Sequence, residues 1–285
     1  MAISPAKLQQ AYLEACESEL QAFKPGNVSV HSAGHDMTVE DFRRSAEASA
    51  PPLCDPVLSL GERIYRAIAD TRKAVGCNTN LGIVLLAAPL LEACLNGNKT
   101  LNLLENVRLV LDKTTLEDAS WVYQAIRLAA PGGLGESEAE DVNSTPTVTL
   151  QEAMKIAAGR DSIASQYTNY YATVFDLMIP RYHSWLSLWG DEQWATVGVF
   201  TGLLVALPDS HIERKFGARF TRMVTDRMTL VEQALTVSGR PEQAMRIIRK
   251  VDTEFKSAGI NPGTTADLTV ACLLAVRLER LLEAG

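Results

Sequence analysis

Apolar residues recur along most of the chain at steps of three and four, the spacing of one face of an α-helix. Cap residues, glycines and prolines separate the segments. No window alternates apolar and polar residues between turns, as a half-buried strand does. The pattern predicts an all-α protein: one large bundle-like domain of about eleven helices over residues 1–285. The expected helices run from Ser4-Pro5 to a stop at Lys24-Pro25-Gly26, from Thr38 to a stop at Pro51-Pro52, and over 57–75, 80–96, 100–112, 115–130, 149–178, 191–207, 210–238, 241–258 and 264–283.

Local signals support several of these boundaries. Thr149 with Glu152 forms a capping box, Pro241 suits a first turn, and Thr264 is a good N-cap. The longest apolar stretches, Leu81–Leu95 and Val197–Leu207, are shorter than the ~20 residues that span a bilayer, so they are expected to be buried core helices.

Composition narrows the class of protein. The net charge of −7, from 34 acidic and 27 basic residues, disfavours a general nucleic-acid binder, which needs a basic track for phosphates. The five cysteines include no C-x-x-C pair, so neither a disulfide framework nor a zinc knuckle is indicated. The N-terminus has no basic segment followed by an apolar run. We therefore expect a cytoplasmic protein that does not act at a membrane.

The first polar loop follows the first helix. Gly26 permits a backbone conformation that other residues avoid, so the loop can present several polar groups to a ligand. The alternative is that Lys24 only complements the helix C-terminus while Gly26 caps it. The polar residues of this loop are Lys24, Asn27, Ser29, His31, His35 and Asp36.

Two polar segments lead straight into apolar helices, where free N–H groups and the helix dipole favour a phosphate. The first is Asn78-Thr79-Asn80, for which an ordinary Asn80 N-cap is the simpler alternative. Gly82, one turn into this helix, costs ~1 kcal/mol relative to alanine and suggests a close approach of a ligand or backbone. The second segment includes Thr264, and Asp267 one turn later suits either the helix dipole or a metal ion.

Two more segments carry charge. Glu136 and Glu138 follow three glycines and either close over a Mg²⁺ ion or form a solvated acidic loop. Further on, Asp209 can cap a helix on which three cationic or titratable residues share a face, either as an anion clamp or as a solvated surface. These three residues are His211, Arg214 and Lys215. Since neither a P-loop nor a G-x-G-x-x-G motif is present, a phosphate site must be assembled from several helix ends.

In this order, the segments resemble the triphosphoribosyl-dephospho-CoA synthase family. The matches run from about residue 12 to 275: Lys24-Pro25-Gly26-Asn27-Val28, Gly34-His35-Asp36-Met37, Phe42-x-x-Ser45-Ala46, Asn78-Thr79 with Gly82, Gly133-x-Gly135-Glu136-x-Glu138-Ala139, Asp209 with Gly217, and Pro262-Gly263-x-x-Ala266-Asp267-Leu268. The resemblance implies an all-helical transferase that moves the triphosphoribosyl part of ATP to a hydroxyl of dephospho-CoA and releases adenine. The product is the precursor of the prosthetic group of citrate lyase and malonate decarboxylase acyl carriers.

The resemblance also implies residue roles. ATP is the expected substrate and Mg²⁺ the expected metal, and the partners are a nucleotide and a cofactor precursor. Acid, base or electrostatic roles fall to Glu19, Asp36, Asp209 and Asp267. The metal is expected at some of Asp36, Glu136, Glu138, Asp209 and Asp267. Substrate and phosphate contacts are expected from Lys24, Asn27, His31, His35, Asn78, Thr79, Asn80, His211, Arg214, Lys215 and Thr264.

Two departures from the family pattern leave alternatives open. Citrate-lyase members carry a His-Lys pair where this chain has Asn80-Leu81, and the family's Gly-Asp-Thr-Asn is replaced by Pro208-Asp209-Ser210-His211. One alternative is a related ATP-dependent step on another acceptor, in methanopterin or methanofuran biosynthesis for one-carbon metabolism. Another is a helical binding or scaffold protein that has lost the chemistry. The sequence leaves the oligomeric state open, a homo-oligomer included.

Overall fold

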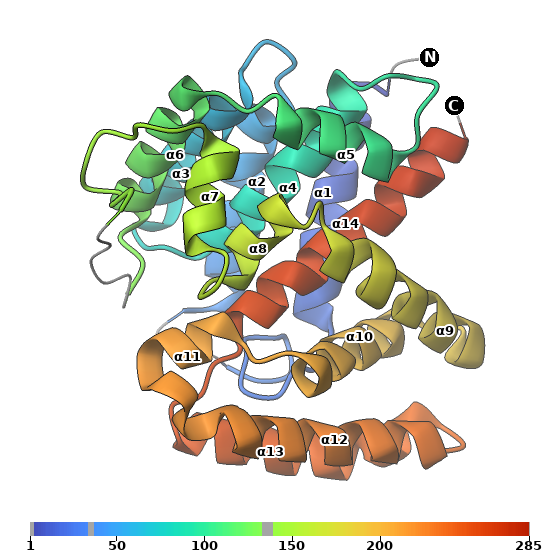
Figure 1. The fold of residues 1–285 in the computed structure, drawn as a ribbon. Coiled ribbons are helices and arrows are strands. Elements are labelled where there is room, and N and C mark those ends of the chain that lie inside the picture. The colour runs from blue at the N-terminus through green and yellow to red at the C-terminus, as the bar shows by residue number, and fades with distance from the viewer. Residues whose placement is uncertain (1–2, 34–36, 133–138, 285) are drawn as a thin grey trace.

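The computed structural model describes residues 3–33, 37–132 and 139–284, and over these residues the protein is helical (Figure 1). The only β-structure among the described residues is an isolated bridge between Ser29 and Ser32, so the predicted all-α class is confirmed. The α-helices are α1 Pro5–Gln21, α2 Val39–Leu53, α3 Leu60–Val75, α4 Leu81–Leu95, α5 Leu103–Asp112, α6 Leu116–Ala129, α7 Leu150–Ala157, α8 Ser162–Thr168, α9 Ile179–Trp189, α10 Glu192–Ala206, α11 Ser210–Phe216, α12 Thr221–Val237, α13 Met245–Ser257 and α14 Gly263–Glu283. A π-helix at Thr173–Met178 and 3-10 turns at Gly217–Phe220 and Pro241–Ala244 complete the described helices.

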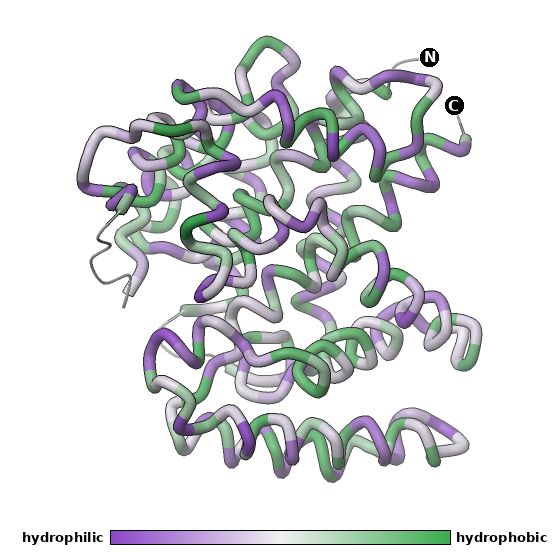
Figure 2. Tube along the Cα trace, viewed as in Figure 1, coloured by the Kyte–Doolittle hydropathy of each residue, from purple (hydrophilic) through white to green (hydrophobic). Residues whose placement is uncertain are grey.

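The helices surround two apolar cores that meet along α10 and at the start of α14. Figure 1 shows α14 crossing the middle of the molecule, with α2–α8 above it, α10–α13 below it and α1 crossing behind it. The larger core is built from α1–α10 and α14, and the smaller core from α10–α14 with Ala22 and Phe23. Apolar residues run along α4 and α14 on every side, whereas α12 and α13 alternate apolar and polar positions (Figure 2). The central helices are therefore buried and the α12–α13 pair is a surface layer.

The described chain has fourteen α-helices rather than about eleven, because two predicted helices are broken and one was missed. The predicted helix 149–178 breaks at Gly159-Arg160-Asp161, where Asp161 Oδ1 accepts the N–H groups of Ile163 and Ala164 and starts α8. The predicted helix 210–238 breaks at Gly217, whose φ of 59° ends α11. The unpredicted helix is α9, which continues directly from the π-helix.

The predicted stop at Pro51-Pro52 was also wrong, since α2 runs to Leu53. Both prolines lie in its last turn. A proline there removes an N–H donor but keeps its carbonyl acceptor. The Pro51 carbonyl accepts the Cys54 N–H at 3.2 Å, so the turn closes before the chain leaves the helix.

Two tyrosines donate to backbone carbonyls of α4, and one of them supplies a donor that the helix lacks. Pro89 lies inside this helix and cannot donate to the carbonyl of Leu85. The hydroxyl of Tyr167 donates to that carbonyl at 2.7 Å, and Tyr171 donates to the Leu86 carbonyl at 2.8 Å. Both tyrosines are fully buried, so they join α4 to the segment around α8.

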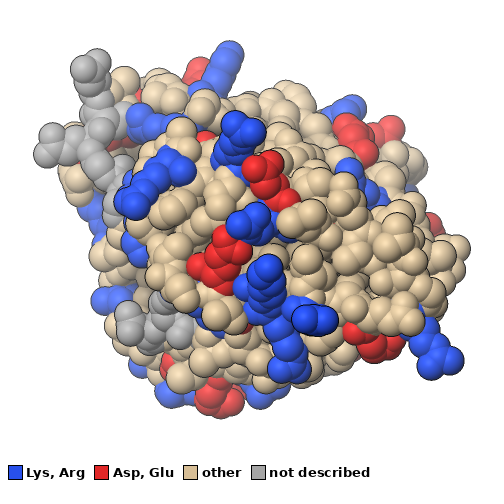
Figure 3. All heavy atoms as spheres, turned by 90° about the horizontal axis from the view of Figure 1, so that it is seen from below, with Lys and Arg blue, Asp and Glu red and all other residues tan. Residues whose placement is uncertain are grey.

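The underside of the molecule carries both signs of charge. Viewed from below, Lys and Arg side chains gather near the middle of this face with acidic side chains beside them (Figure 3). Arg227 of α12 and Glu254 of α13 form one such pair at 2.7 Å. Among the described helices, none alone is long and apolar enough to cross a bilayer; the bent pair 192–206 and 210–237 meets those criteria only in combination.

Candidate functional site

A cavity of about 790 Å³ opens where several helices begin. Residues at the N-terminal ends of α4, α8, α11 and α14 line it together. First-turn N–H groups lack intrahelical partners, and each helix dipole places positive charge at this end. The geometry therefore suits an anionic ligand. The lining residues at these ends are Asn78, Thr79, Leu81 and Gly82, then Asp161 and Ile163, then His211, and finally Gly263, Thr264 and Asp267; Arg214 joins them from the last turn of α11.

The remaining wall of the cavity is mostly apolar. Val122 and Ile126 of α6 face it, together with Leu150 and Met154 of α7. The end of α1 and its following loop contribute Glu19, Leu20, Asn27 and Val28. The cavity thus combines a polar end with an apolar side, as small-molecule sites commonly do.

Asp267 brings a carboxylate into this cavity beside the first turn of α4. A Cβ atom on Gly82 would lie 2.0 Å from Asp267 Oδ2, so only glycine leaves room for the carboxylate. None of the hydrogen bonds or ion pairs among the described residues involves this side chain. Burial raises the pKa of Asp267 well above its usual range, and the negative charges of Glu19, Asp209 and Asp161 raise it further. Asp267 is therefore protonated more readily than an exposed aspartate.

Glu19 is the second carboxyl group of the cavity, and a buried lysine accompanies it. Lys24 Nζ lies 2.6 Å from Glu19 Oε1 and donates to the Val28 carbonyl at 2.7 Å. Burial raises the pKa of Glu19 and lowers that of Lys24, while their mutual attraction opposes both shifts. Glu19 is therefore a cavity carboxyl group with a buried cation beside it.

Helix α11 contributes an imidazole and a guanidinium group. Burial lowers the pKa of His211 to about 4, with a further contribution from Arg214 and Lys215, so the ring is neutral at pH 7. Arg214 Nη1 lies 3.4 Å from Asp161 Oδ2, which holds the guanidinium at the cavity wall. Arg214 is thus the α11 cation placed to meet an anion there.

Residues 5–285 match the family described as ATP:dephospho-CoA triphosphoribosyl transferase (CitG). The chain belongs to this family. Its members transfer a triphosphoribosyl group from ATP, and this chain is accordingly a transferase with ATP as its donor. A solved structure from Archaeoglobus fulgidus, provisionally described as a triphosphoribosyl-dephospho-CoA synthase, matches with a TM-score of 0.63 and 23% identity, over 81% of this chain and 96% of that one. At this identity the likeness shows the shared fold. No protein of curated description matches the sequence.

Eight residues predicted for this triphosphoribosyl transferase line the one cavity, although they come from five separate parts of the sequence. Thr264 differs in one respect: it does not cap α14, which begins at Gly263, and its Oγ1 accepts a hydrogen bond from Ser210 at 3.1 Å. The eight residues are Glu19, Asn27, Asn78, Thr79, His211, Arg214, Thr264 and Asp267.

Other predicted ligands lie away from the cavity wall. Lys24 is fully buried against Glu19, so it is not exposed to a phosphate. His31 is exposed and its Nε2 lies 3.0 Å from the Gln21 carbonyl. Lys215 extends over the ring of Phe216, 5.1 Å from its centre. These three side chains do not line the cavity, and their predicted substrate contacts remain predictions.

Asn80 and Asp209 also have structural partners. Asn80 Nδ2 donates to Ser45 and Ser49, while the amide of Leu81 is capped by Asn78 instead, so the simple Asn80 cap was wrong. Asp209 Oδ1 accepts the Ile212 N–H at 3.0 Å and Oδ2 accepts the N–H and hydroxyl of Thr265, both at 2.7 Å. With both oxygens bonded inside the protein, Asp209 joins α11 to α14 and does not face the cavity.

The geometry does not by itself form a magnesium site. Within the described residues, no three His, Cys, Asp or Glu side chains group as metal ligands. Of the predicted ligands, Asp36, Glu136 and Glu138 lie outside the described residues, as does His35. Asp209 is already hydrogen-bonded, so the described ligand set does not fit Mg²⁺ alone.

Several cavity residues of this family member were missed from the sequence. They include Tyr123, Glu140, Asp161 and Asn261. Asp161 had a signal, because Gly159-Arg160-Asp161-Ser162 reads as a helix end followed by an N-cap. Tyr123 had none, since it continues the apolar period of its helix.

Proposed function

We propose that this chain transfers the triphosphoribosyl group of ATP to a hydroxyl of dephospho-CoA in the cavity described above. The acceptor oxygen forms a bond to C1′ of the ATP ribose and the C1′–N9 bond breaks. Its electron pair leaves with adenine, which takes up one proton while the acceptor hydroxyl loses one. The juxtaposition of Asp267 and Gly82, at a cavity shared with Glu19, carries this proposal.

The two carboxyl groups suit the two proton transfers. Asp267 forms no ion pair among the described residues, and burial raises its pKa well above the usual range although the charge of Arg214 opposes the shift, so it is the proton donor to adenine. Lys24 lies against Glu19 and favours its ionised form, so Glu19 is the base for the acceptor hydroxyl. In many active sites the general acid and the general base are two carboxyl groups whose different surroundings give them different pKa values.

The polar end of the cavity is the proposed triphosphate site. Arg214 supplies a fixed cation, and the first turns of α4 and α14 supply N–H groups. Mg²⁺ is proposed to bind with the triphosphate, where it neutralises phosphate charge; such ions need only one or two protein carboxylates. Asp36, Glu136 and Glu138 remain the candidates from the sequence for those ligands.

The apolar wall is the proposed site of the acceptor. The largely uncharged arm of dephospho-CoA suits Val122, Ile126, Leu150 and Met154. A cytoplasmic location is part of the proposal, since both substrates are intracellular metabolites.

A different acceptor is the second candidate, and one observation favours it. Leu81 lines the cavity at the position where citrate-lyase members carry the lysine of their His-Lys pair. A cation at that position would face the cavity, whereas leucine offers only apolar contact. A related step on a cofactor precursor of one-carbon metabolism would fit such a change.

Adenine release from ATP, measured with dephospho-CoA and Mg²⁺, tests the proposed reaction. Asp267→Asn and Glu19→Gln should each lower kcat by about a hundredfold or more, the usual effect of removing a general acid or base. Asp226→Asn, on the exposed face of α12, is the control and should keep the wild-type rate. Wild-type kcat in Asp267→Asn, or ATP binding without adenine release for any hydroxyl acceptor, would overturn the proposal.

Leu81→Lys separates the two acceptors. Restoring the cation should lower KM for dephospho-CoA by about tenfold, because a hydrogen bond to a charged group contributes ~1.5–3 kcal/mol. Leu81→Met, which keeps the apolar contact, should leave KM unchanged. If dephospho-CoA already reacts efficiently and Leu81→Lys changes nothing, the second acceptor is rejected.

A further inference from the structure

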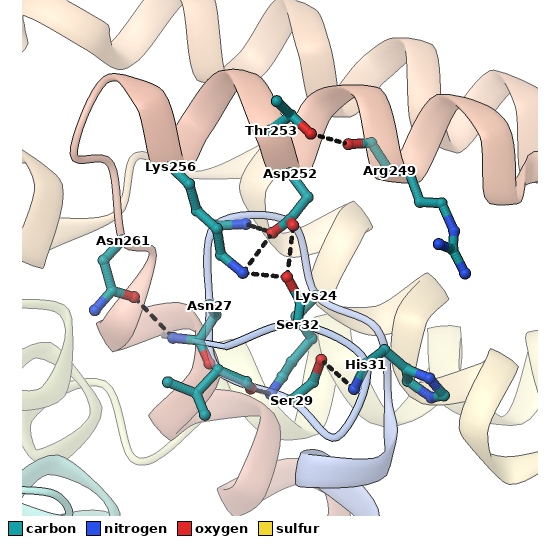
Figure 4. Close-up of polar contacts among 12 residues, drawn as sticks. Lys24, Asn27, Ser29, His31, Ser32, Arg249, Asp252, Thr253, Lys256 and Asn261 are labelled. Atoms are coloured by element: carbon teal, nitrogen blue, oxygen red, sulfur yellow. Dashed lines mark hydrogen bonds and ion pairs between the residues drawn. The ribbon is translucent and has the colours of Figure 1, made fainter. Parts of the chain in front are cut away.

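A carboxylate of α13, outside the cavity, holds the loop that follows α1. Asp252 is buried; its Oδ1 accepts the N–H of Gly26 at 2.8 Å and its Oδ2 accepts the hydroxyl of Ser32 at 2.6 Å. Lys256, one turn later, lies 3.2 Å from Asp252 and also donates to Ser32. Figure 4 shows both α13 side chains pointing toward the loop. One carboxylate thus ties the two arms of the loop to one helix.

The loop has little room to settle elsewhere. Gly26 has a φ of 81°, and a Cβ atom there would lie 2.9 Å from the Ile260 carbonyl. Its neighbour Asn27 donates from Nδ2 to Asn261 Oδ1 at 2.8 Å, and both asparagines line the cavity. Through Gly26, Asp252 therefore acts on the position of a cavity side chain (Figure 4).

The same loop carries the partner of Glu19. Lys24 is two residues before Gly26, and its Nζ bridges Glu19 and the Val28 carbonyl. A shift of the loop would move Lys24 and Asn27 together. Charge-assisted hydrogen bonds are roughly twice as strong as neutral ones, so the loss of the Asp252 carboxylate releases both arms of the loop at once.

We propose that Asp252 is a positioning residue for the transfer reaction, acting through the 24–32 loop on Asn27 and on the Lys24–Glu19 pair. This inference rests on the proposed function. It goes beyond a role in packing α13, because a packing role affects stability without a specific effect on turnover.

Asp252→Ala and Val251→Ala provide the test. Val251 is the adjacent buried residue of α13 and packs in the smaller core, without a hydrogen bond to the loop. Both variants should lose stability, but only Asp252→Ala should lower kcat, by about ten- to a hundredfold, because small displacements of reacting groups have effects of this size. Asp252→Asn, which keeps an acceptor for the Gly26 N–H, should recover part of the loss.

Two further measurements separate the outcomes. Amide hydrogen exchange at residues 24–32 should accelerate at least tenfold in Asp252→Ala and stay unchanged in Val251→Ala, which reports loop position without any assay of activity. In the double variant Asp252→Ala/Asn27→Ala, kcat should be only slightly lower than in the less active of the two single variants, because both changes act on the 24–32 loop. The inference would be overturned if the fold-reductions in kcat of the two single variants multiplied in the double variant. Equal kcat in Asp252→Ala and Val251→Ala would also overturn it. If the wild type releases no adenine while exchange responds as expected, it is the proposed function that fails.

Discussion

A single glycine decides whether Asp267 can face the cavity. Helix propensity alone favours alanine at position 82 by about 1 kcal/mol, so the glycine weakens its own helix. The space it leaves is occupied by the Asp267 carboxylate and by the tip of Ile163. At position 82, the space needed by the Asp267 carboxylate outweighs the helix propensity of alanine, as is common at functional positions.

Gly82→Ala should therefore reduce kcat by about a hundredfold, because the added methyl group would lie 2.0 Å from Asp267 Oδ2 and must displace it. Gly239→Ala is the matched control, since no heavy atom lies within 4 Å of a Cβ at that position. Steady-state rates and melting temperatures of both variants check this expectation. Undiminished turnover in Gly82→Ala would show that the position of Asp267 is unimportant.

His211 gives the protein a specific dependence on pH. Its pKa is about 4 in the folded protein and 6.5 as an isolated group, so the unfolded chain binds a proton between these values that the folded chain does not. The free energy of unfolding therefore falls as pH drops from 6.5 toward 4, by roughly 3 kcal/mol in total. Above pH 6.5 this contribution is complete.

Urea unfolding at pH 7 and pH 4.5 measures the effect. His211→Gln cannot titrate and should lose less stability over this interval than the wild type does, whereas the exposed His183→Gln should behave as the wild type. The carboxyl groups with raised pKa values act in the opposite direction, but they are common to all three proteins. Identical pH profiles for wild type and His211→Gln would contradict the assignment.

At the scale of the element, α4 continues through Pro89, where a side chain from another segment supplies the hydrogen-bond donor that proline lacks. Tyr167 and Tyr171 donate to the carbonyls of Leu85 and Leu86 from a segment in which Tyr170 and Tyr171 both have positive φ values. The irregular segment between α8 and α9 thus has a structural function: it supports the helix whose first turn borders the cavity.

Tyr167→Phe should lower the free energy of unfolding by about 1–3 kcal/mol, because it leaves the buried Leu85 carbonyl unpaired. Tyr170→Phe is the control. Its hydroxyl contacts Asp112 at an exposed position, where loss of the bond should have little effect. Denaturant unfolding of both variants compares the two, and equal losses would mean that the carbonyl finds another partner.

The sequence predicts the helices better than it predicts their interruptions. Periodicity locates apolar helices such as α4 and α14 because every residue contributes to the signal. The break at Asp161 depends on one capping residue, which apolar positions on both sides obscure. The partner of Lys24 could not be predicted from the sequence. Whether Lys24 contacts Glu19 or a ligand depends on the position of a loop, which is fixed by Asp252, 228 positions later in the chain. The convergence of helix ends was predicted, and eight of the predicted side chains line the cavity, but the inward positions of Tyr123 and Asn261 were not predicted.

At the scale of the whole molecule, the cavity lies where the two cores meet. Leu85 and Leu150 of its wall belong to the larger core, while Ala266 belongs to the smaller one. Arg214 is carried by α11, which packs in the smaller core through Ile212. A ligand that contacts both Arg214 and the first turn of α4 therefore joins the two cores. Such a ligand binds the folded chain and not the unfolded one.

ATP with Mg²⁺ should consequently raise the melting temperature. At about 100 times its dissociation constant a ligand adds ~2.7 kcal/mol, which for a chain of this length corresponds to about 4 °C. Arg214→Gln should reduce this shift, because it deletes one of the arginines, Arg160 and Arg214, that line the cavity. Arg222→Gln, whose side chain is 95% exposed on α12, loses the same charge far from the cavity and should keep the shift. Equal shifts in the two variants would place the triphosphate elsewhere, and no shift in the wild type at millimolar ATP would favour a helical binding protein that has lost the chemistry.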